Sequence, residues 1–270
     1  MAAARVLAIE SEPGDILSPS TCNGYLGCSA KVYFRKVAKL PDPPTGSLTM
    51  GSAVHAAIGT NFEQKLDTRQ DLGPAGVRAI YLDAWDRLVK GEHEKGSFPT
   101  EFREDENPAE LKAQGLALTL KYLEEVCPEV EPAAVEAHVA GRIGGVLVHG
   151  YIDLMDTSGR IIDLKTAARK PSEIGSDYRF QVATYSQLMT GASGEARVDT
   201  LVKTKTPQLV QLTCKVEQSD MDATARLYPL VQQSIRAGVW LPNRGSNLCS
   251  RNYCSFWRAC QDAFGGKVSA

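Results

Sequence analysis

The spacing of apolar residues changes near residue 130 of the chain. Before that point they recur every three or four positions, and beyond it they alternate. The first spacing is typical of helices with one buried face, and the second of half-buried strands. The expected helices are residues 18–37, 50–65, 77–90 and 108–126, then 177–189 and 218–239. The expected strands are residues 133–140, 145–155, 160–166, 197–204 and 208–216.

This order predicts an α/β fold with a mixed central sheet flanked by helices, an N-terminal helical elaboration and a Cys-rich C-terminal region. The 270 residues suit one domain. We therefore expect a single domain over 1–270, with a mainly helical part at 1–130 and the core at 131–240. Residues 241–270 form the Cys-rich part.

The composition limits the possible partners and location of the protein but does not identify its function. The net charge of −2 means that a nucleic-acid partner would need a locally basic surface. No segment has the length and apolarity of a membrane span or the pattern of a secretion signal, so we expect a cytoplasmic protein without membrane contact. The odd count of seven cysteines argues against a disulfide framework.

Two acids and a lysine stand out in the alternating segment. Asp153 is separated by a turn from Asp163-Leu164-Lys165, and folding the two strands back brings Asp153 near Asp163. Asp163 and Lys165 share one face of their strand. Charged groups on such apolar strands are costly to bury unless they are paired or bind a metal. A structural ion pair is one reading, and a hard oxygen site for Mg²⁺ or Mn²⁺ is the other.

The surrounding motifs resemble the RecB-like branch of the PD-(D/E)xK nucleases. Asp153 with Asp163-Leu164-Lys165 matches the signature of that superfamily, although Ile152 stands at the position of its nominal proline. Upstream, Gly51 and His55 match the Gly-x-x-x-His motif of the branch. Downstream, Gln181-Val-Ala-Thr-Tyr185 matches its Gln-x-x-x-Tyr motif.

The resemblance implies a restriction-endonuclease-like core and a role for each motif residue. His55, Asp153, Asp163 and the backbone carbonyl of Leu164 would hold Mg²⁺ or Mn²⁺, and Lys165 would be the catalytic lysine. Gln181 and Tyr185 would contact the DNA backbone or support the site.

Three cysteines, Cys249, Cys254 and Cys260, crowd into the last 22 residues, a spacing that suits one metal centre. The chain resembles the cluster-bearing branch of RecB-like nucleases, AddB and the CRISPR-associated proteins, with one upstream and three downstream cysteines. That resemblance implies a 4Fe-4S cluster with Cys28 as the fourth ligand. Cys22 is the rival for that position, and zinc is the rival metal. The cluster would clip distant parts of the chain together.

We expect a metal-dependent deoxyribonuclease, acting as an exonuclease on single-stranded or end-containing DNA, 5′ to 3′ by analogy. Recombination, repair, phage or CRISPR DNA processing would supply protein partners. Two alternatives are a non-catalytic iron–sulfur subunit that binds DNA or assists assembly, and a zinc-stabilised phosphodiesterase with another substrate. Single-stranded DNA would be held by local cations and stacking aromatics. The candidate DNA contacts are Lys31, Arg35, Lys36, Arg169, Lys170, Arg179, Lys203, Lys205, Tyr25, Tyr178 and Trp257.

Overall fold

The computed structural model describes residue 12 and residues 14–92 and 97–269. They form two compact units, described separately. The cysteine unit comprises the described residues up to Leu40, Ala140–Gly150, and the chain from Met221 onward. The sheet unit comprises Pro41–Val139 and Tyr151–Asp220. The expectation of a single domain over the whole chain stays a prediction.

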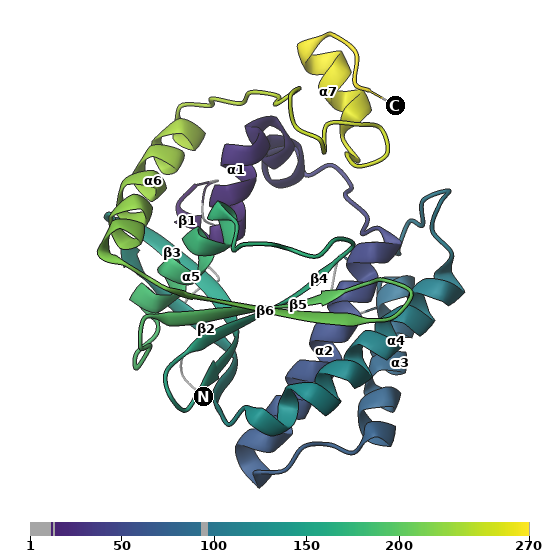
Figure 1. Cartoon of the computed structure of the whole chain (residues 1–270). Coiled ribbons are helices and arrows are strands. Elements are labelled where there is room, and N and C mark those ends of the chain that lie inside the picture. Colours follow the sequence, from purple (N-terminus) through teal and green to yellow (C-terminus); the bar gives the residue numbers. More distant parts are fainter. Residues whose placement is uncertain (1–11, 13, 93–96, 270) are drawn as a thin grey trace. The chain divides into compact units, whose positions relative to one another are not determined.

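The sheet unit is built on a mixed sheet with helices, as Figure 1 shows. Strand β4 (Ile161–Ala167) lies between β3 (Val146–Asp156), which is antiparallel to it, and β5 (Glu195–Val202), which is parallel. Strand β6 (Gln208–Lys215) continues the sheet beyond β5, and β2 (Pro132–Ile143) pairs with β3. This arrangement confirms the mixed α/β fold that the sequence predicts.

Three helices pack against one face of this sheet. They are α2 (Gly46–Thr68), α3 (Pro74–Lys90) and α4 (Pro108–Glu125), and a short 3-10 turn, η2 (Cys127–Glu129), follows them. Their apolar side chains share one buried core with the strands. Ile162 and Leu164 of β4 point into that core, so alternation turns Asp163 and Lys165 toward the other face, where helix α5 (Ser176–Leu188) supplies contacts.

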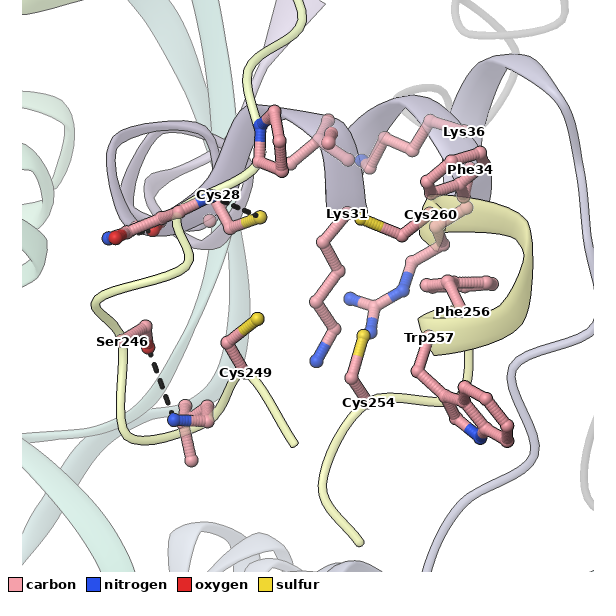
Figure 2. A pocket seen from close by; sticks show the side chains of 18 of the residues that line it. Cys28, Lys31, Phe34, Lys36, Ser246, Cys249, Cys254, Phe256, Trp257 and Cys260 are labelled. Carbon is pink, nitrogen blue, oxygen red and sulfur yellow. Dashed lines mark hydrogen bonds between the residues drawn. The ribbon is translucent and has the colours of Figure 1, made fainter. Parts of the chain in front are cut away.

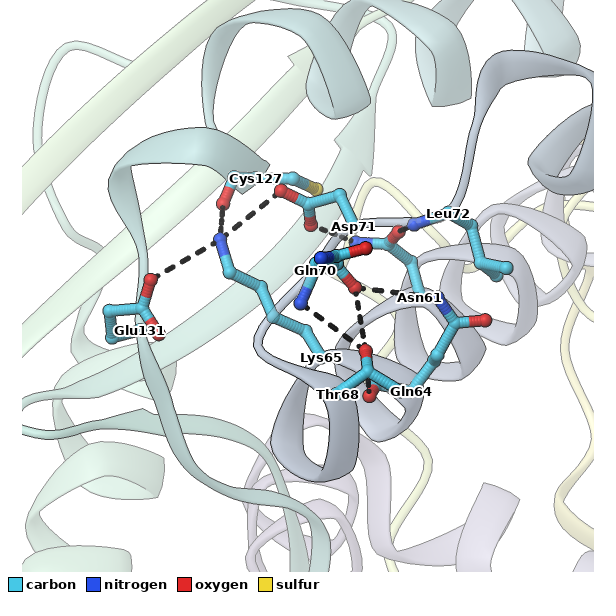
Figure 3. Close-up of polar contacts among 9 residues, drawn as sticks. All are labelled: Asn61, Gln64, Lys65, Thr68, Gln70, Asp71, Leu72, Cys127 and Glu131. Carbon is cyan, nitrogen blue, oxygen red and sulfur yellow. Dashed lines mark hydrogen bonds and ion pairs between the residues drawn. The ribbon is translucent and has the colours of Figure 1, made fainter.

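A buried lysine fastens helix α2 to the segment after α4 (Figure 3). Lys65 is only 3% exposed, and its Nζ donates to the carbonyl of Cys127 at 2.6 Å and to Asp71 at 3.1 Å. Asn61 donates to the same aspartate at 2.7 Å, and Glu131 lies 3.7 Å from Nζ. The buried cation thus pairs with a half-buried carboxylate and a buried carbonyl.

The cysteine unit contains an α-helix and a π-helix near its N-terminal end, and two further α-helices toward the C-terminus. Strand β1 (Ile16–Leu17) pairs in parallel with the start of β3, and helix α1 (Pro19–Val32) follows, capped by Ser18. A π-helix, η1 (Tyr33–Val37), continues α1. Helix α6 (Gln218–Arg236) runs from the sheet unit into this unit, and α7 (Trp257–Phe264) lies near the C-terminus.

Element boundaries depart from the sequence expectation at a few places. The expected helix over 50–65 begins four residues earlier, because Thr45 caps it by accepting a bond from Leu48 N. The expected helix over 18–37 divides into α1 and η1, with Cys28 in a non-helical conformation. Strand β1 and helix α7 were not expected, since two and eight residues are too short for a periodic signal.

Candidate active site and cysteine cluster

The hairpin of β3 and β4 sets the two acids opposite each other. Its turn is closed by Asp156, whose carboxylate accepts bonds from the backbone N–H of Ser158 and of Arg160, both at 3.0 Å. Gly159 has a φ of 79°, which a residue with a side chain rarely adopts. The resulting register pairs Leu154 with Ile162, so Asp153 stands across from Asp163 as the sequence predicts.

Asp163 is the most buried carboxylate of the group, with 2% of its surface exposed. Its Oδ1 accepts bonds from Lys165 Nζ and Gln181 Nε2, both at 2.8 Å. Burial raises the pKa of this carboxyl to about 6, against the opposing effect of Lys165. Oδ2 is buried and accepts no well-directed hydrogen bond, although Lys165 Nζ lies 2.7 Å away. A buried carboxylate oxygen in this state suits a metal ion.

Lys165 is held between carboxylates and an aromatic ring. Burial by itself lowers its pKa, but the charges of Asp163 and Asp153 outweigh this and leave the pKa raised. The lysine therefore stays protonated at neutral pH. Its Nζ lies 5.4 Å from the ring centre of Tyr178, a contact that favours a cation.

His55 reaches the hairpin from helix α2. Its Nδ1 lies 3.6 Å from Oδ2 of Asp153, which also accepts the backbone N–H of Leu164 at 2.9 Å. Burial lowers the pKa of His55 despite Asp153, so the imidazole is neutral at pH 7 and suited to ligate a metal. The first position of the Gly-x-x-x-His motif favours glycine, because a Cβ on Gly51 would lie 2.9 Å from Oγ1 of Thr166 on β4.

Gln181 and Tyr185 line one face of α5, as their spacing predicts. Gln181 donates to Asp163, and its hydrogen bond with Tyr185 partly offsets the burial and carboxylate charges that raise the phenol's pKa. Tyr185 is 7% exposed and packs with Val139, Ile152 and Ile161. Gln181 thus contacts a carboxylate directly, and Tyr185 contacts Gln181.

Glu136 of β2 is a member of this site that the sequence did not predict. It lines a small hollow of about 20 Å³ together with His55 and Asp153. Burial, then the charges of Asp153 and Glu63, raise the pKa of Glu136 to about 7. Its φ of 44° breaks the regular alternation of β2, so strand periodicity does not show where its side chain points.

The arrangement can attract a divalent cation, but it is not a preformed cage. Among the described residues, no three His, Cys, Asp or Glu side chains stand together in a way that would hold a metal ion. The donors nevertheless converge in type: carboxylates of Asp153 and Asp163, a neutral imidazole, and the backbone of Leu164, which bonds to His55. Oxygen donors with one imidazole suit Mg²⁺ or Mn²⁺, which keep several water ligands.

The predicted cluster cysteines lie around one cavity of about 300 Å³ in the cysteine unit. Cys28, Cys249, Cys254 and Cys260 all line it, and Figure 2 shows their sulfurs with Lys31 among them. Burial raises the pKa of the Cys254 and Cys260 thiols, and the charges of Cys28 and Cys249 raise both further.

Contacts from the rest of the cysteine unit hold these cysteines in place. The Cys28 thiol accepts the N–H of Asn243 at 3.4 Å, and the Phe34 ring lies 5.8 Å from that of Phe256. The rival Cys22 is fully buried, and burial raises its pKa to about 12. It is not among the residues that line the cavity.

Several of the expected DNA contacts are engaged within the protein, among them Lys36, which donates to Oγ1 of Thr21, and Tyr25, which donates to the carbonyl of Val239. The guanidinium of Arg179 pairs with Asp220, with Nη2 2.6 Å and Nε 3.2 Å from its two oxygens. Lys203 donates to Oγ of Ser47 at 2.7 Å.

In the described part of the chain, no helix is both long enough and apolar enough to cross a membrane.

Comparison with known proteins identifies the family. The sequence profile of the PD-(D/E)XK nuclease superfamily matches residues 16–261. The chain belongs to this superfamily. The hairpin acids and Lys165 described above lie within the matched residues.

One solved structure supports the fold. A "putative exonuclease" from Eubacterium rectale shares 13% identity, covers 95% of this chain and 91% of its own, and superposes with a TM-score of 0.56. A protein titled SSO0001 shares 12% identity over 88% of this chain and 90% of its own, with a TM-score of 0.38. No curated protein matches the sequence.

Proposed function

We propose that this nuclease-superfamily protein is a metal-dependent deoxyribonuclease whose active site contains His55, Asp153, Asp163 and Lys165. The observation that supports this most strongly is Oδ2 of Asp163, a buried oxygen without a well-directed hydrogen bond beside a protonated lysine. Mg²⁺ or Mn²⁺ would be held by His55, Asp153, Asp163 and the carbonyl of Leu164. When bound, the ion would polarise the phosphoryl oxygen and lower the pKa of the attacking water.

Each of the other side chains has its own role in the reaction. Lys165, charged at neutral pH, orients the attacking water and stabilises the negative charge that develops on the phosphoryl oxygens. Gln181 fixes Asp163 through its 2.8 Å bond, and Tyr185 supports Gln181. Water adds to phosphorus, the bridging P–O bond breaks, and the products are a phosphomonoester end and a hydroxyl end.

The proposed substrate is single-stranded or end-containing DNA, degraded as an exonuclease in the 5′ to 3′ direction. The solved protein from Eubacterium rectale, named as an exonuclease, supports an end-directed activity. We place this activity in recombination, repair, phage or CRISPR DNA processing, with protein partners from those pathways. We also propose the cytoplasm as its location, where the seven cysteines, all free in the structure, would stay reduced.

We further propose that Cys28, Cys249, Cys254 and Cys260 hold a 4Fe-4S cluster. The shared cavity of about 300 Å³ supports this assignment, because it has room for a group much larger than a single ion. Its role is structural, since it joins α1 to the C-terminal segment. Iron and acid-labile sulfide in anaerobically purified protein test the assignment, and a colourless protein containing zinc instead would contradict it.

Replacing Lys165 tests the proposed nuclease mechanism directly. Lys165→Ala should lower cleavage of labelled single-stranded DNA at least about a hundredfold, because a charge that acts in the transition state is lost. Lys90→Ala, at an exposed lysine of α3, is the matched control. Substrates labelled at the 5′ or 3′ end, with Mg²⁺ or Mn²⁺, report polarity. Wild-type protein that binds DNA but cleaves nothing with either metal would indicate a non-catalytic subunit instead.

A further inference from the structure

The positive charge of this acidic protein is concentrated in two segments of the cysteine unit. The whole chain has 30 Lys and Arg against 32 Asp and Glu. Residues 18–39 and 241–269 together contain eight of these basic side chains and one acid, Asp262. A local excess of seven positive charges is therefore present in a protein with a net charge of −2. Such a concentration is typical of a surface that binds a polyanion.

Hydrogen bonds join the two segments. The backbone N–H of Ala30 donates to the carbonyl of Leu241 at 3.2 Å, and Asn243 donates to the carbonyl of Gly27 at 2.9 Å. Two of the counted cations are used internally, since Arg244 donates to the carbonyl of Gly265 at 2.8 Å and Lys36 donates to Oγ1 of Thr21 at 2.7 Å. The charges of α1 and of the C-terminal segment thus belong to one folded body.

An aromatic ring lies between cations at the C-terminal end of this surface. The guanidinium of Arg251 lies 4.8 Å from the ring centre of Trp257, and that of Arg258 lies 5.0 Å from it. Both arginines are exposed, and neither is ion-paired with a carboxylate in the described part of the chain. The indole keeps the guanidinium planes ordered, which lowers the entropy lost when they bind phosphate. Tyr253, 50% exposed, stands in the same segment.

We propose that Arg251, Trp257, Arg258 and Tyr253 form a binding surface for single-stranded DNA, separate from the residues that perform the cleavage. The arginines contact successive phosphates, and the aromatic side chains stack on unpaired bases. The choice of single over double strands follows from the aromatic rings, because bases within a duplex do not expose their faces. This inference rests on the proposed function in taking DNA as the partner, but it concerns binding and requires no cleavage.

Binding in the absence of metal tests the surface. Fluorescence anisotropy with a labelled oligothymidine of about 15 nucleotides, in EDTA, gives the Kd at several salt concentrations. The double variant Arg251→Ala with Arg258→Ala should weaken binding about tenfold and reduce the slope of log K against log salt by about 1.4. Trp257→Ala should weaken binding of the single strand more than that of a duplex, and Trp257→Phe should restore most of it. Arg226→Ala, an exposed arginine of α6, is the matched control.

The outcomes separate this surface from the catalytic proposal. Lys165→Ala is read for cleavage only and the arginine and tryptophan variants for binding, so failed cleavage and failed binding are read from different variants. Thermal melting and iron content show that each variant remains folded. Unchanged affinity in the double variant, or equal loss of single-strand and duplex binding in Trp257→Ala, would overturn the inference whatever the cleavage assay gives.

Discussion

The ammonium group of Lys165 lies 2.7 Å from Oδ2 of Asp163, two positions earlier on the same face of β4. An ion pair of this kind is often purely structural. Here the pair adjoins Asp153 and the neutral His55, and one of its carboxylate oxygens lacks a well-directed hydrogen bond. A divalent cation would take up that oxygen and leave Lys165 available to the phosphoryl group. The environment of this ion pair therefore supports the proposed metal site.

The stability of the metal-free protein should depend on pH through Asp163. Its pKa in the folded protein is about 6, against a usual value of 3.8. A raised pKa means that the folded state binds the proton more tightly than the unfolded chain. The stability contributed by Asp163 is thus fully present below the unfolded pKa and is lost as pH rises through about 6.

Chemical denaturation in EDTA checks this sign. The free energy of unfolding of the wild type minus that of Asp163→Asn should decrease between the two pKa values and then level off. The asparagine variant serves as the reference because it does not titrate. A difference that stays constant across this range would show that the carboxyl is not perturbed in the folded protein.

Gln181→Ala should lower kcat about tenfold with little change in KM, because Asp163 loses a fixed donor while the substrate contacts remain. The matched control is Gln187→Ala on the same helix, whose amide donates to the carbonyl of Ala183. A positioning role also predicts a higher Mg²⁺ concentration for half-maximal activity. If Gln181→Ala raised KM alone, the amide would be a substrate contact instead.

Glu136→Gln should raise the Mg²⁺ concentration required for activity. The negative charge of Glu136 lies near Asp153, so it adds to the attraction for a divalent cation. Glu124→Gln removes an exposed charge from helix α4 that does not act on Glu136, and it is the control. Titrations of cleavage rate against Mg²⁺ compare the two variants. Equal curves for Glu136→Gln and the wild type would assign the glutamate no part in metal binding.

The hairpin could be predicted because the residues that determine it are close together in the sequence. The turn at Gly159 and the period of two in β4 fix which side chains share a face, so the juxtaposition of Asp153, Asp163 and Lys165 follows from spacing alone. Their interpretation as a nuclease site required the family resemblance. His55 and Gln181 required the family resemblance, since nothing nearby in sequence indicates that α2 and α5 reach β4. Tyr122 donates to Asp199 at 2.8 Å, 77 positions away, and such long-range polar pairs leave no periodic signal. Glu136 was missed because its positive φ interrupts the pattern of its strand.

Replacing each rival cysteine should identify the fourth cluster ligand. Cys28→Ser should lose iron, visible absorbance and thermal stability, because Cys28 lines the cavity with the three C-terminal cysteines. Cys22→Ala should keep the iron, with only a modest loss of stability from a small buried cavity. Iron retained in Cys28→Ser and lost in Cys22→Ala would reverse the assignment.

Lys65→Ala should destabilise the protein far more than the substitution of a partly exposed lysine. It would leave the Asp71 carboxylate and the carbonyl of Cys127 without their cation, at a cost of about 3–5 kcal/mol in the free energy of unfolding. Lys121→Ala is the matched control, because its pair with Glu125 is a partly exposed i,i+4 contact whose loss costs about 0.3–0.5 kcal/mol. Urea denaturation of both variants gives the comparison. The second variant Asp71→Asn with Lys65→Met removes both charges and should recover part of the loss, whereas equal stability of Lys65→Ala and Lys121→Ala would show that the buried contacts contribute little.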